Sequence, residues 1–298
     1  MNNNSASIPD ICCIGHITHD KVITPKFEAH MPGGTAYYFA KALVNFDHSA
    51  FSLITAVGED NKEVIDELRA DGIDVTVLPS RHSVFFENKY AENMADRTQR
   101  VLAKADPFTT ENLAGAKARI FHLGTLLADD FSFEVIKYLS GIGIVSVDIQ
   151  GYLRHVIGEK VYPVDYDMKR EAMPYIHILK ANEMEMKVLT GLSDPYEAAR
   201  ELADWGCREV LLTLGENGSL IYADGCFHEI PAIPASEVVD TTGCGDTYMA
   251  GYLYMRARGA SYQEAGTFAA AMCTLKIGRK GPFDGTPADV AAILPACC

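Results

Sequence analysis

The chain has 298 residues, of which 48% are hydrophobic, so it can bury the core of one large α/β domain or of two smaller ones. Its formal net charge of −14 argues against nucleic acid and membrane as partners, because both favour basic surfaces. The eight cysteines include no Cys-x-x-Cys pair, so we expect neither a disulfide framework nor a zinc site. The first ten residues are polar and contain no signal-peptide core, which predicts a cytoplasmic protein.

Apolar runs and helical patterns alternate along most of the chain. The expected strands lie at 11–15, 51–58, 119–123, 142–148, 176–180, 209–214 and 219–222. The expected helices lie at 37–45, 61–70, 131–140, 182–190, 195–204, 242–258, 262–277 and 287–294. Repeated strand–helix units predict a mostly parallel central sheet flanked by helices on both faces.

Residues 75–105 have a different pattern. Strand-like runs with polar alternation occur at 84–86, 89–90 and 97–102, no helical pattern lies between them, and a turn is expected at 92–96. We therefore predict a small β-sheet inserted into the α/β chain. Together with residues 18–28 it would form a lid.

A glycine-rich loop precedes the helix expected at 242–258. It reads Asp240-Thr241-Thr242-Gly243-Cys244-Gly245-Asp246. The first amides of a helix lack partners within it and lie at the positive end of its dipole, so they suit a phosphate. Glycine at 243 and 245 would let a phosphate approach the backbone. Asp246 either complements the helix dipole or accepts a proton from a hydroxyl that attacks the phosphate.

Each of four further groups of residues can have either a structural role or a role in binding a ligand. Asn182 and Glu185 have the spacing of a helix capping box, which requires no ligand. Gly215 and Gly218 lie between two expected strands and suit a hairpin turn. The pair Gly33–Gly34 can be a flexible entry to a helix, and Asp20 a solvated acid at a strand edge. Gln150 and Arg154 follow an apolar strand, where α/β sheets bind ligands, although Arg154 can equally be a surface cation.

The loop at 240–246 resembles the C-terminal signature of the ribokinase-like (PfkB) carbohydrate kinases, with Cys244 where that pattern usually has alanine. The order of the N-terminal Gly-Gly, the β insertion and the C-terminal loop is similar to that family over nearly the whole chain. The resemblance implies a single ribokinase-like α/β domain over residues 1–298, with the lid covering a sugar site.

The resemblance also implies a role for each matching residue. Asp246 would be the catalytic base, and the amides of Gly243, Cys244 and Gly245 would hold the transferred phosphate. ATP would lie beside Asn182, Thr213, Gly215, Gly218 and Thr242. Asn182 and Glu185 would hold Mg²⁺ through water, as suits a hard cation that keeps its waters. A monovalent cation, potassium, would bind near Asp240. The acceptor would contact Asp20, Gly33, Gly34, Tyr38, Gln150 and Arg154.

Two departures from the family pattern bear on the acceptor. Thr18 and Tyr38 stand where the family often has asparagine, and a bulky aromatic at position 38 argues against ribose. The segment with Gln150 resembles that of the inositol- and fructose-type branches of the family, so the resemblance implies an ATP-dependent kinase of a fructose-like sugar or a cyclitol. The alternatives are a nucleoside kinase on the same scaffold and a non-catalytic sugar sensor. No Gly-x-Gly-x-x-Gly follows the first strand, which argues against a nicotinamide cofactor. Family members often form homodimers through the lid.

Overall fold

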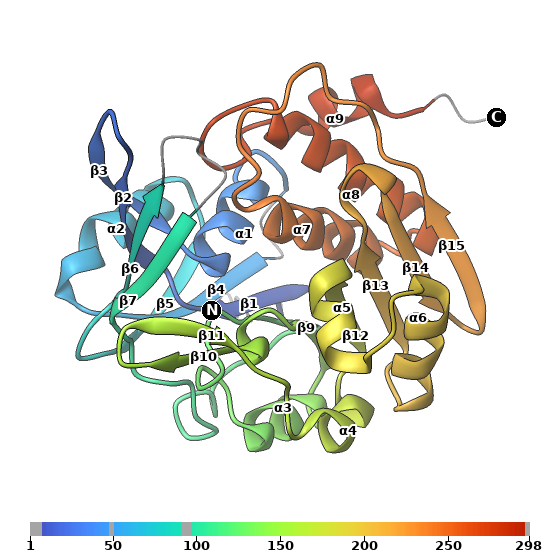
Figure 1. Ribbon diagram of the computed structural model, residues 1–298, viewed down its shortest axis with the longest axis horizontal. Coiled ribbons are helices and arrows are strands. Elements are labelled where there is room, and N and C mark those ends of the chain that lie inside the picture. The colour runs from blue at the N-terminus through green and yellow to red at the C-terminus, as the bar shows by residue number, and fades with distance from the viewer. Residues whose placement is uncertain (1–7, 48–50, 91–96, 296–298) are drawn as a thin grey trace, which may run out of the picture.

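The computed structural model describes residues 8–47, 51–90 and 97–295, whose strands form two sheets (Figure 1). In spatial order, the larger sheet contains β15 (Cys226–Ile230), β14 (Ser219–Ala223), β13 (Glu209–Thr213), β12 (Ile178–Asn182), β9 (Ile144–Asp148), β8 (Ile120–Gly124), β1 (Ile11–Gly15), β4 (Phe51–Val57) and β5 (Asp74–Pro79). The strands from β13 to β5 are parallel, and β14 is antiparallel to both of its neighbours.

Helices cover both faces of the larger sheet. One face carries α1 (Thr35–Leu43), α2 (Lys62–Ala70), α7 (Cys244–Ala257), α8 (Tyr262–Ile277) and α9 (Pro287–Ile293). The other carries α3 (Phe133–Ser140), α4 (Lys169–Ala172), α5 (Glu183–Thr190) and α6 (Pro195–Asp204).

The two-residue period of β1 explains these two layers. Ile11 and Cys13 belong to the hydrophobic cluster on the α7 side, whereas Cys12 and Ile14 belong to the cluster on the α3 side. A parallel strand that is covered from both sides needs apolar residues at every position. This arrangement confirms the mostly parallel α/β sheet that the sequence predicts.

The smaller sheet contains six strands and lies on the left of Figure 1. In spatial order they are β10 (Arg154–Ile157), β11 (Lys160–Pro163), β7 (Arg97–Ala103), β6 (Val84–Tyr90), β2 (Thr18–Ile23) and β3 (Glu28–Gly33). Its pairs are antiparallel except β2 with β6.

The boundaries expected for the lid, 18–28 and 75–105, differ from these strands in two ways. The strand β5 is the edge strand of the larger sheet and does not belong to the smaller one, so the segment before Val84 was placed wrongly. An edge strand alternates between buried and exposed positions, and this pattern resembles that of a lid strand. The strands β3, β10 and β11 also belong to the smaller sheet, and the expected turn at 92–96 lies outside the described residues.

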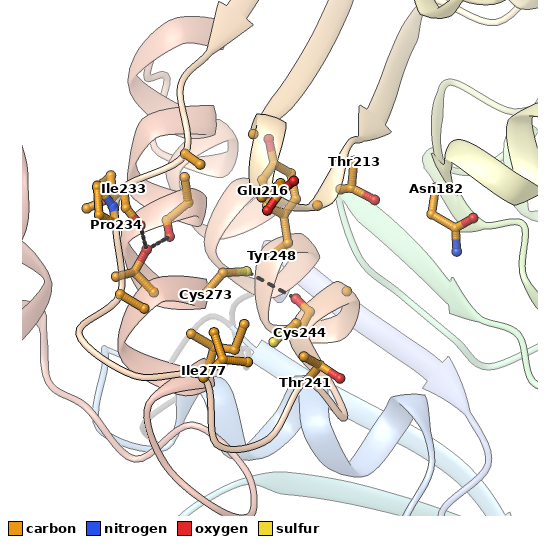
Figure 2. A pocket seen from close by; sticks show the side chains of 18 of the residues that line it. Asn182, Thr213, Glu216, Ile233, Pro234, Thr241, Cys244, Tyr248, Cys273 and Ile277 are labelled. Carbon is orange, nitrogen blue, oxygen red and sulfur yellow. Dashed lines mark hydrogen bonds between the residues drawn. The ribbon is translucent and has the colours of Figure 1, made fainter. Parts of the chain in front are cut away.

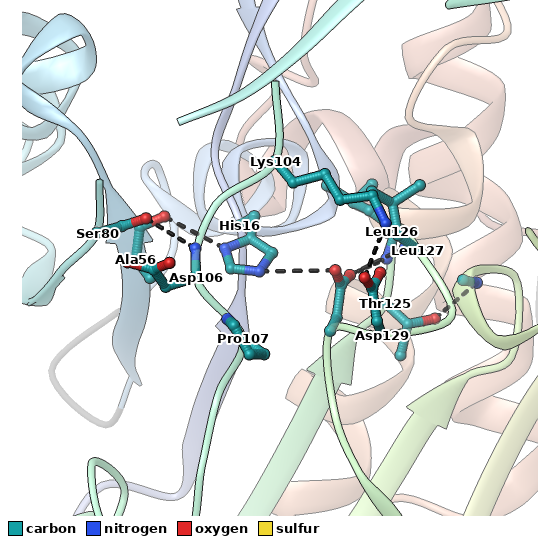
Figure 3. Close-up of polar contacts among 12 residues, drawn as sticks. His16, Ala56, Ser80, Lys104, Asp106, Pro107, Thr125, Leu126, Leu127 and Asp129 are labelled. Carbon is teal, nitrogen blue, oxygen red and sulfur yellow. Dashed lines mark hydrogen bonds and ion pairs between the residues drawn. The ribbon is translucent and has the colours of Figure 1, made fainter. Parts of the chain in front are cut away.

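Buried polar contacts surround His16, where the chain passes from the larger sheet to the smaller one (Figure 3). His16, between β1 and β2, places Nδ1 3.2 Å from the backbone oxygen of Ala56 and Nε2 3.6 Å from Oδ1 of Asp130. The other carboxylate oxygen of Asp130 accepts hydrogen bonds from the amides of Leu126 and Leu127. These two leucines pack against apolar side chains of the smaller sheet, so the junction is both polar and apolar.

Within the residues that the structure describes, no helix has the length and apolar character required to cross a membrane.

Candidate active site

Helix α7 begins at the glycine loop. Gly243 is its N-terminal cap and has a left-handed backbone, with φ of 77° and ψ of 6°. A β-carbon at this position would lie 2.3 Å from Cδ1 of Tyr38, so glycine is required both for the backbone angles and for space. The first amides of α7 have no partner within the helix and lie at the positive end of its dipole. This helix end is therefore suited to an anion, as the sequence predicts.

Asp240 holds the loop in shape. Its Oδ1 accepts a hydrogen bond from the Thr242 amide at 2.9 Å, and its Oδ2 accepts one from the Gly281 amide at 3.2 Å. The Lys276 ammonium donates to the Asp240 backbone oxygen at 2.8 Å and lies 3.2 Å from Oδ2. Burial favours a higher pKa for Asp240, but the hydrogen bonds from Thr242 and the charge of Lys276 outweigh it and lower the pKa. Asp240 is therefore a carboxylate with a structural role in the loop.

A buried cluster of charged side chains lies against the same loop. The Lys180 ammonium donates a hydrogen bond to Oδ2 of Asp148 at 2.9 Å and lies 3.8 Å from Oε2 of Glu185. Lys180 is 5% exposed and Asp148 2% exposed. A β-carbon at Gly245 would lie 3.0 Å from the Lys180 ammonium. This ammonium therefore lies beside Gly245 of the glycine loop.

Asp246 lies in the first turn of α7 and is partly buried. Burial raises its pKa well above the ordinary value, and the negative charges of Asp148 and Glu185 raise it further, while Lys180 opposes them. Burial thus acts against the helix dipole, which favours the charged form of an acid in the first turn. A carboxylate with a raised pKa is a stronger base, so this environment suits proton transfer.

Lys180 and Asp148 were not assigned a role from the sequence. Both occur within apolar strand patterns, and buried charges are rare unless they are paired. That signal was present in the chain. The partnership itself depends on the register between β12 and β9, in which Lys180 is opposite Asp148.

Asn182 and Glu185 form the capping box that their spacing predicts. Oδ1 of Asn182 accepts the Glu185 amide at 2.9 Å, and Oε2 of Glu185 accepts the Asn182 amide at 2.8 Å. Burial raises the pKa of Glu185, against the lowering effect of Lys180. The capping box uses one of the two carboxylate oxygens, so it is compatible with a second role toward a water-coordinated cation.

A cavity of about 800 Å³ opens beside the start of α7 (Figure 2). Its polar lining includes Asn182, Thr213 and the backbone of Gly215 and Gly218, which were all expected at the nucleotide site. Thr242 does not line this cavity, but its neighbour Thr241 does. The remaining walls are mainly apolar and come from the 232–238 segment, α7 and α8: Ala232, Ile233, Pro234, Ala235, Val238, Tyr248, Ala270 and Ile277.

The glycines of this cavity also have structural reasons. Gly218 has a φ of 85°, and a β-carbon there would lie 2.1 Å from the backbone oxygen of Ile230. Gly215 has a φ of 57° and starts a short 3-10 turn through Asn217. The turn interpretation of this motif therefore holds, and the same turn forms one edge of the cavity.

Four residues expected at the acceptor site, Asp20, Gly33, Gly34 and Tyr38, do not line this cavity. Thr18 donates a hydrogen bond to Oδ1 of Asp20 at 2.6 Å, and a β-carbon at Gly33 would lie 2.7 Å from Oδ2 of Asp20. Gly34 has a φ of 87° and precedes α1, which carries Tyr38. The pKa of the Tyr38 hydroxyl is raised by burial and then by the charges of Asp20, Asp240 and Asp246. Tyr38 is therefore close to Gly243 of the glycine loop, and the charge of Asp20 also acts on its hydroxyl.

Gln150 and Arg154 follow β9 as expected, but Arg154 belongs to the smaller sheet. The Gln150 amide donates to Oδ1 of Asp148 at 3.1 Å. The Arg154 guanidinium donates to the Gln99 side chain of β7 and lies 5.7 Å from the ring of Phe86. Its positive charge is one of the influences that oppose the rise in the pKa of Glu185. Arg154, on the smaller sheet, thus has an electrostatic interaction with the charged cluster.

The parallel sheet, the glycine loop before α7 and the adjacent carboxylate together define the ribokinase-like class of kinases. The sequence profile of the pfkB family carbohydrate kinases matches residues 10–289, and the chain therefore belongs to this family. This result confirms the family that the loop at 240–246 indicates.

Two curated relatives match most of the chain. It is 30% identical over 266 residues to the cytidine kinase of Thermococcus kodakarensis, with 86% of this chain and 91% of that protein covered. It is 32% identical over 250 residues to a nucleoside kinase of Methanothermobacter thermautotrophicus, with 79% and 75% covered.

Solved structures share the fold. A pyrophosphate-dependent kinase of the ribokinase family, complexed with a pyrophosphate analog and myo-inositol, has a TM-score of 0.82 at 28% identity and covers 95% of this chain and 100% of its own. Ribokinase of Arabidopsis thaliana, complexed with ribose and ATP, has a TM-score of 0.79 at 22% identity, with 98% and 100% covered. The latter similarity shows the ribokinase-like fold alone.

Proposed function

We propose that this protein is an ATP-dependent kinase that transfers the γ-phosphoryl group to a hydroxyl of a small polyol, either a fructose-like sugar or a cyclitol. The position of the α7 N-terminus carries this proposal. Cys244 and Gly245 line the large cavity, whereas Tyr38 packs against Gly243 and neither Tyr38 nor Asp20 lines the cavity. A donor in the cavity and an acceptor beside Asp20 would therefore meet at the anion-binding amides.

The shape of the cavity supports ATP as the donor rather than pyrophosphate. A volume of about 800 Å³ lies within the range of small-molecule sites, ~300–1,000 Å³. Its apolar walls, which include Ile233, Val238 and Ile277, offer surface for a planar base. Pyrophosphate has no apolar part that would bind there. Because a kinase of similar structure is pyrophosphate-dependent, the assay below compares ATP with pyrophosphate as the donor.

The chain's own residues supply three effects in this proposal. The amides of Gly243, Cys244 and Gly245 stabilise the charge that develops on the transferred group, as oriented dipoles do in an enclosed site. Lys180 adds a fixed positive charge beside them. Asp246 orients the acceptor hydroxyl and takes its proton as the new bond forms.

Asn182 and Glu185 fit the expected magnesium site. An amide and a carboxylate are ligand types that suit a hard cation which retains its waters, and Asn182 also lines the donor cavity. When bound, Mg²⁺ neutralises negative charge on the donor phosphates. Potassium was also expected, near Asp240, whose oxygens contact Lys276.

A nucleoside kinase is the second candidate. The 30% identity with a cytidine kinase over most of both chains favours it. The partly buried carboxylate of Asp20 could bind two hydroxyls of a ribose, a sugar or a cyclitol equally well, since a carboxylate accepts several hydrogen bonds. Tyr38 favours the smaller acceptors, because its ring already occupies the space next to Gly243.

A substrate panel tests the proposal. The protein with Mg²⁺ is given ATP or pyrophosphate together with fructose-type sugars, cyclitols or nucleosides, and release of ADP or orthophosphate is measured. We expect turnover with ATP and a sugar or cyclitol. Turnover confined to nucleosides would establish the second candidate, and acceptor binding without turnover would indicate a sensor.

Asp246→Asn tests the role of the base in the same assay. We expect kcat to fall by about 10²–10⁴-fold while ATP still binds, because the amide cannot accept the proton. Glu197→Gln is a matched control, since Glu197 is an exposed acid in the first turn of α6. Near-normal turnover of Asp246→Asn would contradict the proposed mechanism.

A further inference from the structure

A lysine side chain is fully buried behind the anion-binding loop. Lys276 lies in the last turn of α8 and is 1% exposed. Moving an ammonium out of water is costly unless the protein supplies paired charge and hydrogen-bond acceptors. Asp240 supplies both, since its backbone oxygen is 2.8 Å and its Oδ2 3.2 Å from the Lys276 nitrogen.

The same aspartate joins three segments of the chain. The amides of Val239 and Asp240 donate to the backbone oxygen of Ile277, at the end of α8. The carboxylate accepts the Thr242 amide of the loop and the Gly281 amide of the connection to α9. The Lys276 ammonium is therefore at the point where the loop, α8 and this connection meet.

The positive charge of Lys276 reaches the first residue of α7. Burial raises the pKa of the Cys244 thiol to about 11, and Lys276 is the strongest influence that opposes this rise. The thiol of Cys273, on the same helix as Lys276, donates to the Cys244 backbone oxygen at 3.2 Å (Figure 2). Helix α8 is thus coupled to the loop by charge and by a direct hydrogen bond.

We propose that the Lys276 ammonium takes the place of the monovalent cation expected beside Asp240, and that Lys276 is a positioning residue for the anion-binding loop. A bound cation would use the backbone and carboxylate oxygens that the ammonium already contacts, and the two like charges would repel each other. A tethered ammonium cannot dissociate, so the loop would keep its shape and its positive potential in any salt. This inference rests on the proposed function, because it assigns a phosphate to the loop.

The first test compares monovalent cations at constant ionic strength. For the unaltered protein, we expect equal kcat in potassium, sodium and tetramethylammonium buffers. A several-fold activation by potassium would overturn the proposal. This comparison does not depend on whether any variant folds.

The second test removes the ammonium. We expect Lys276→Ala to lower kcat at least about tenfold, with little change in the KM of the acceptor, since it disturbs the groups that stabilise transferred charge. Potassium, ammonium or methylammonium ions should restore part of the activity of Lys276→Ala, and Lys276→Arg should retain more activity than Lys276→Ala. Loss of activity that no cation restores, or Lys276→Arg as inactive as Lys276→Ala, would overturn the proposal.

Lys41→Ala is the matched control. Lys41 also pairs with two carboxylates, Glu67 and Asp71, at 2.8 Å each, but it belongs to α1. Its variant should lose stability without any response to cations. A cation response equal to that of Lys276→Ala would show a general salt effect and overturn the proposal.

Melting temperature gives a readout that is independent of catalysis. Potassium in place of tetramethylammonium should raise the melting temperature of Lys276→Ala but not that of the unaltered protein. If the panel shows no kinase activity and this shift is still seen, the proposed function fails while the cation-mimicking role of Lys276 stands. If turnover is normal and the shift is absent, the inference about Lys276 fails alone.

Discussion

Lys180 faces three carboxylates at the site, those of Asp148, Glu185 and Asp246. It forms an ion pair with Asp148 at 2.9 Å, approaches Glu185 to 3.8 Å and lowers the pKa of Asp246 through its charge. The excess of negative charge, together with burial, keeps the pKa values of Asp246 and Glu185 above their ordinary range. Burial and Asp148 thus raise the pKa of the proposed base, and Lys180 limits that rise.

Lys180→Met should move the acidic limb of the pH profile of kcat/KM to higher pH. Asp246 acts as a base only when ionised, and removing the nearby positive charge raises its pKa further, so ionisation requires a higher pH. The variant should also lose about 3–5 kcal/mol of stability, because Asp148 remains buried without its partner. The measurements are a pH–rate profile and denaturant unfolding at neutral pH.

Lys187→Met is the control for Lys180→Met, because Lys187 is exposed on the neighbouring helix α5. It should leave the profile and the stability nearly unchanged. An acidic limb that does not move in Lys180→Met would mean that Asp246 is not the titrating base.

At the scale of elements, the helices that have clear capping residues at their N-terminal ends could be predicted from the sequence. Helix α6 starts with Asp194 as its cap and Pro195 in its first turn, and α8 starts with a capping box made by Ser261 and Glu264. Both helices begin and end at the predicted residues. The glycine loop before α7 was predicted for a similar reason, since its glycines form a local sequence pattern, although the contact of Gly243 with Tyr38 is not local.

Elements that depend on distant pairing were missed. The strands β10 and β11 are four residues each, and the side chains of β10 alternate between intermediate and exposed positions, so no apolar run marks them. The pairing of Lys180 with Asp148 joins residues 32 positions apart in the chain. Neither can be read from a local pattern, because both depend on which strands become neighbours.

Gly243→Ala should destabilise the start of α7 by more than the free-energy cost of the backbone conformation alone. The left-handed φ of 77° costs an alanine roughly 1–2 kcal/mol, and its β-carbon would collide with the Tyr38 ring. We expect a larger loss of stability than that cost and a clear drop in kcat, because the loop or Tyr38 has to move. Thermal unfolding and the kinase assay measure the two effects.

Gly259→Ala provides the comparison for Gly243→Ala, since Gly259 follows the other end of α7. It has a φ of 82°, and a β-carbon there would meet no atom within 4 Å. It should show the backbone cost alone, with normal turnover. Equal effects of the two substitutions would contradict the steric role of Tyr38.

At the scale of the whole molecule, global stability should fall as the pH is lowered from 6.5 toward 4, in part because of His122. This residue of β8 is 1% exposed, stacks on Phe39 and places Nδ1 3.0 Å from the Ser146 hydroxyl. Burial, the largest effect, lowers its pKa from 6.5 to about 4. The unfolded chain then binds the proton first, so the contribution of His122, about 3 kcal/mol, is present above pH 6.5 and lost as the pH falls to 4.

His122→Gln should therefore reduce the difference in unfolding free energy between pH 7 and pH 4 by about 3 kcal/mol relative to the unaltered protein. Glutamine can still bond to Ser146 but cannot gain charge. His82→Gln is the control, because His82 is exposed. Denaturant unfolding at the two pH values measures the difference, and an unchanged pH dependence in His122→Gln would rule out this role.

The smaller sheet is built from three separate excursions of the chain, 18–33, 84–103 and 154–163, each of which leaves the larger sheet and returns to it. The three outgoing segments start after β1, β5 and β9, which are parallel, so they depart from a common edge. Six connections of the chain therefore link the smaller sheet to the larger one. A rotation of the smaller sheet relative to the larger one would bend all six connections and would move Asp20, which lies on β2. If an acceptor binds Asp20 as proposed, its binding would therefore depend on the orientation of the smaller sheet.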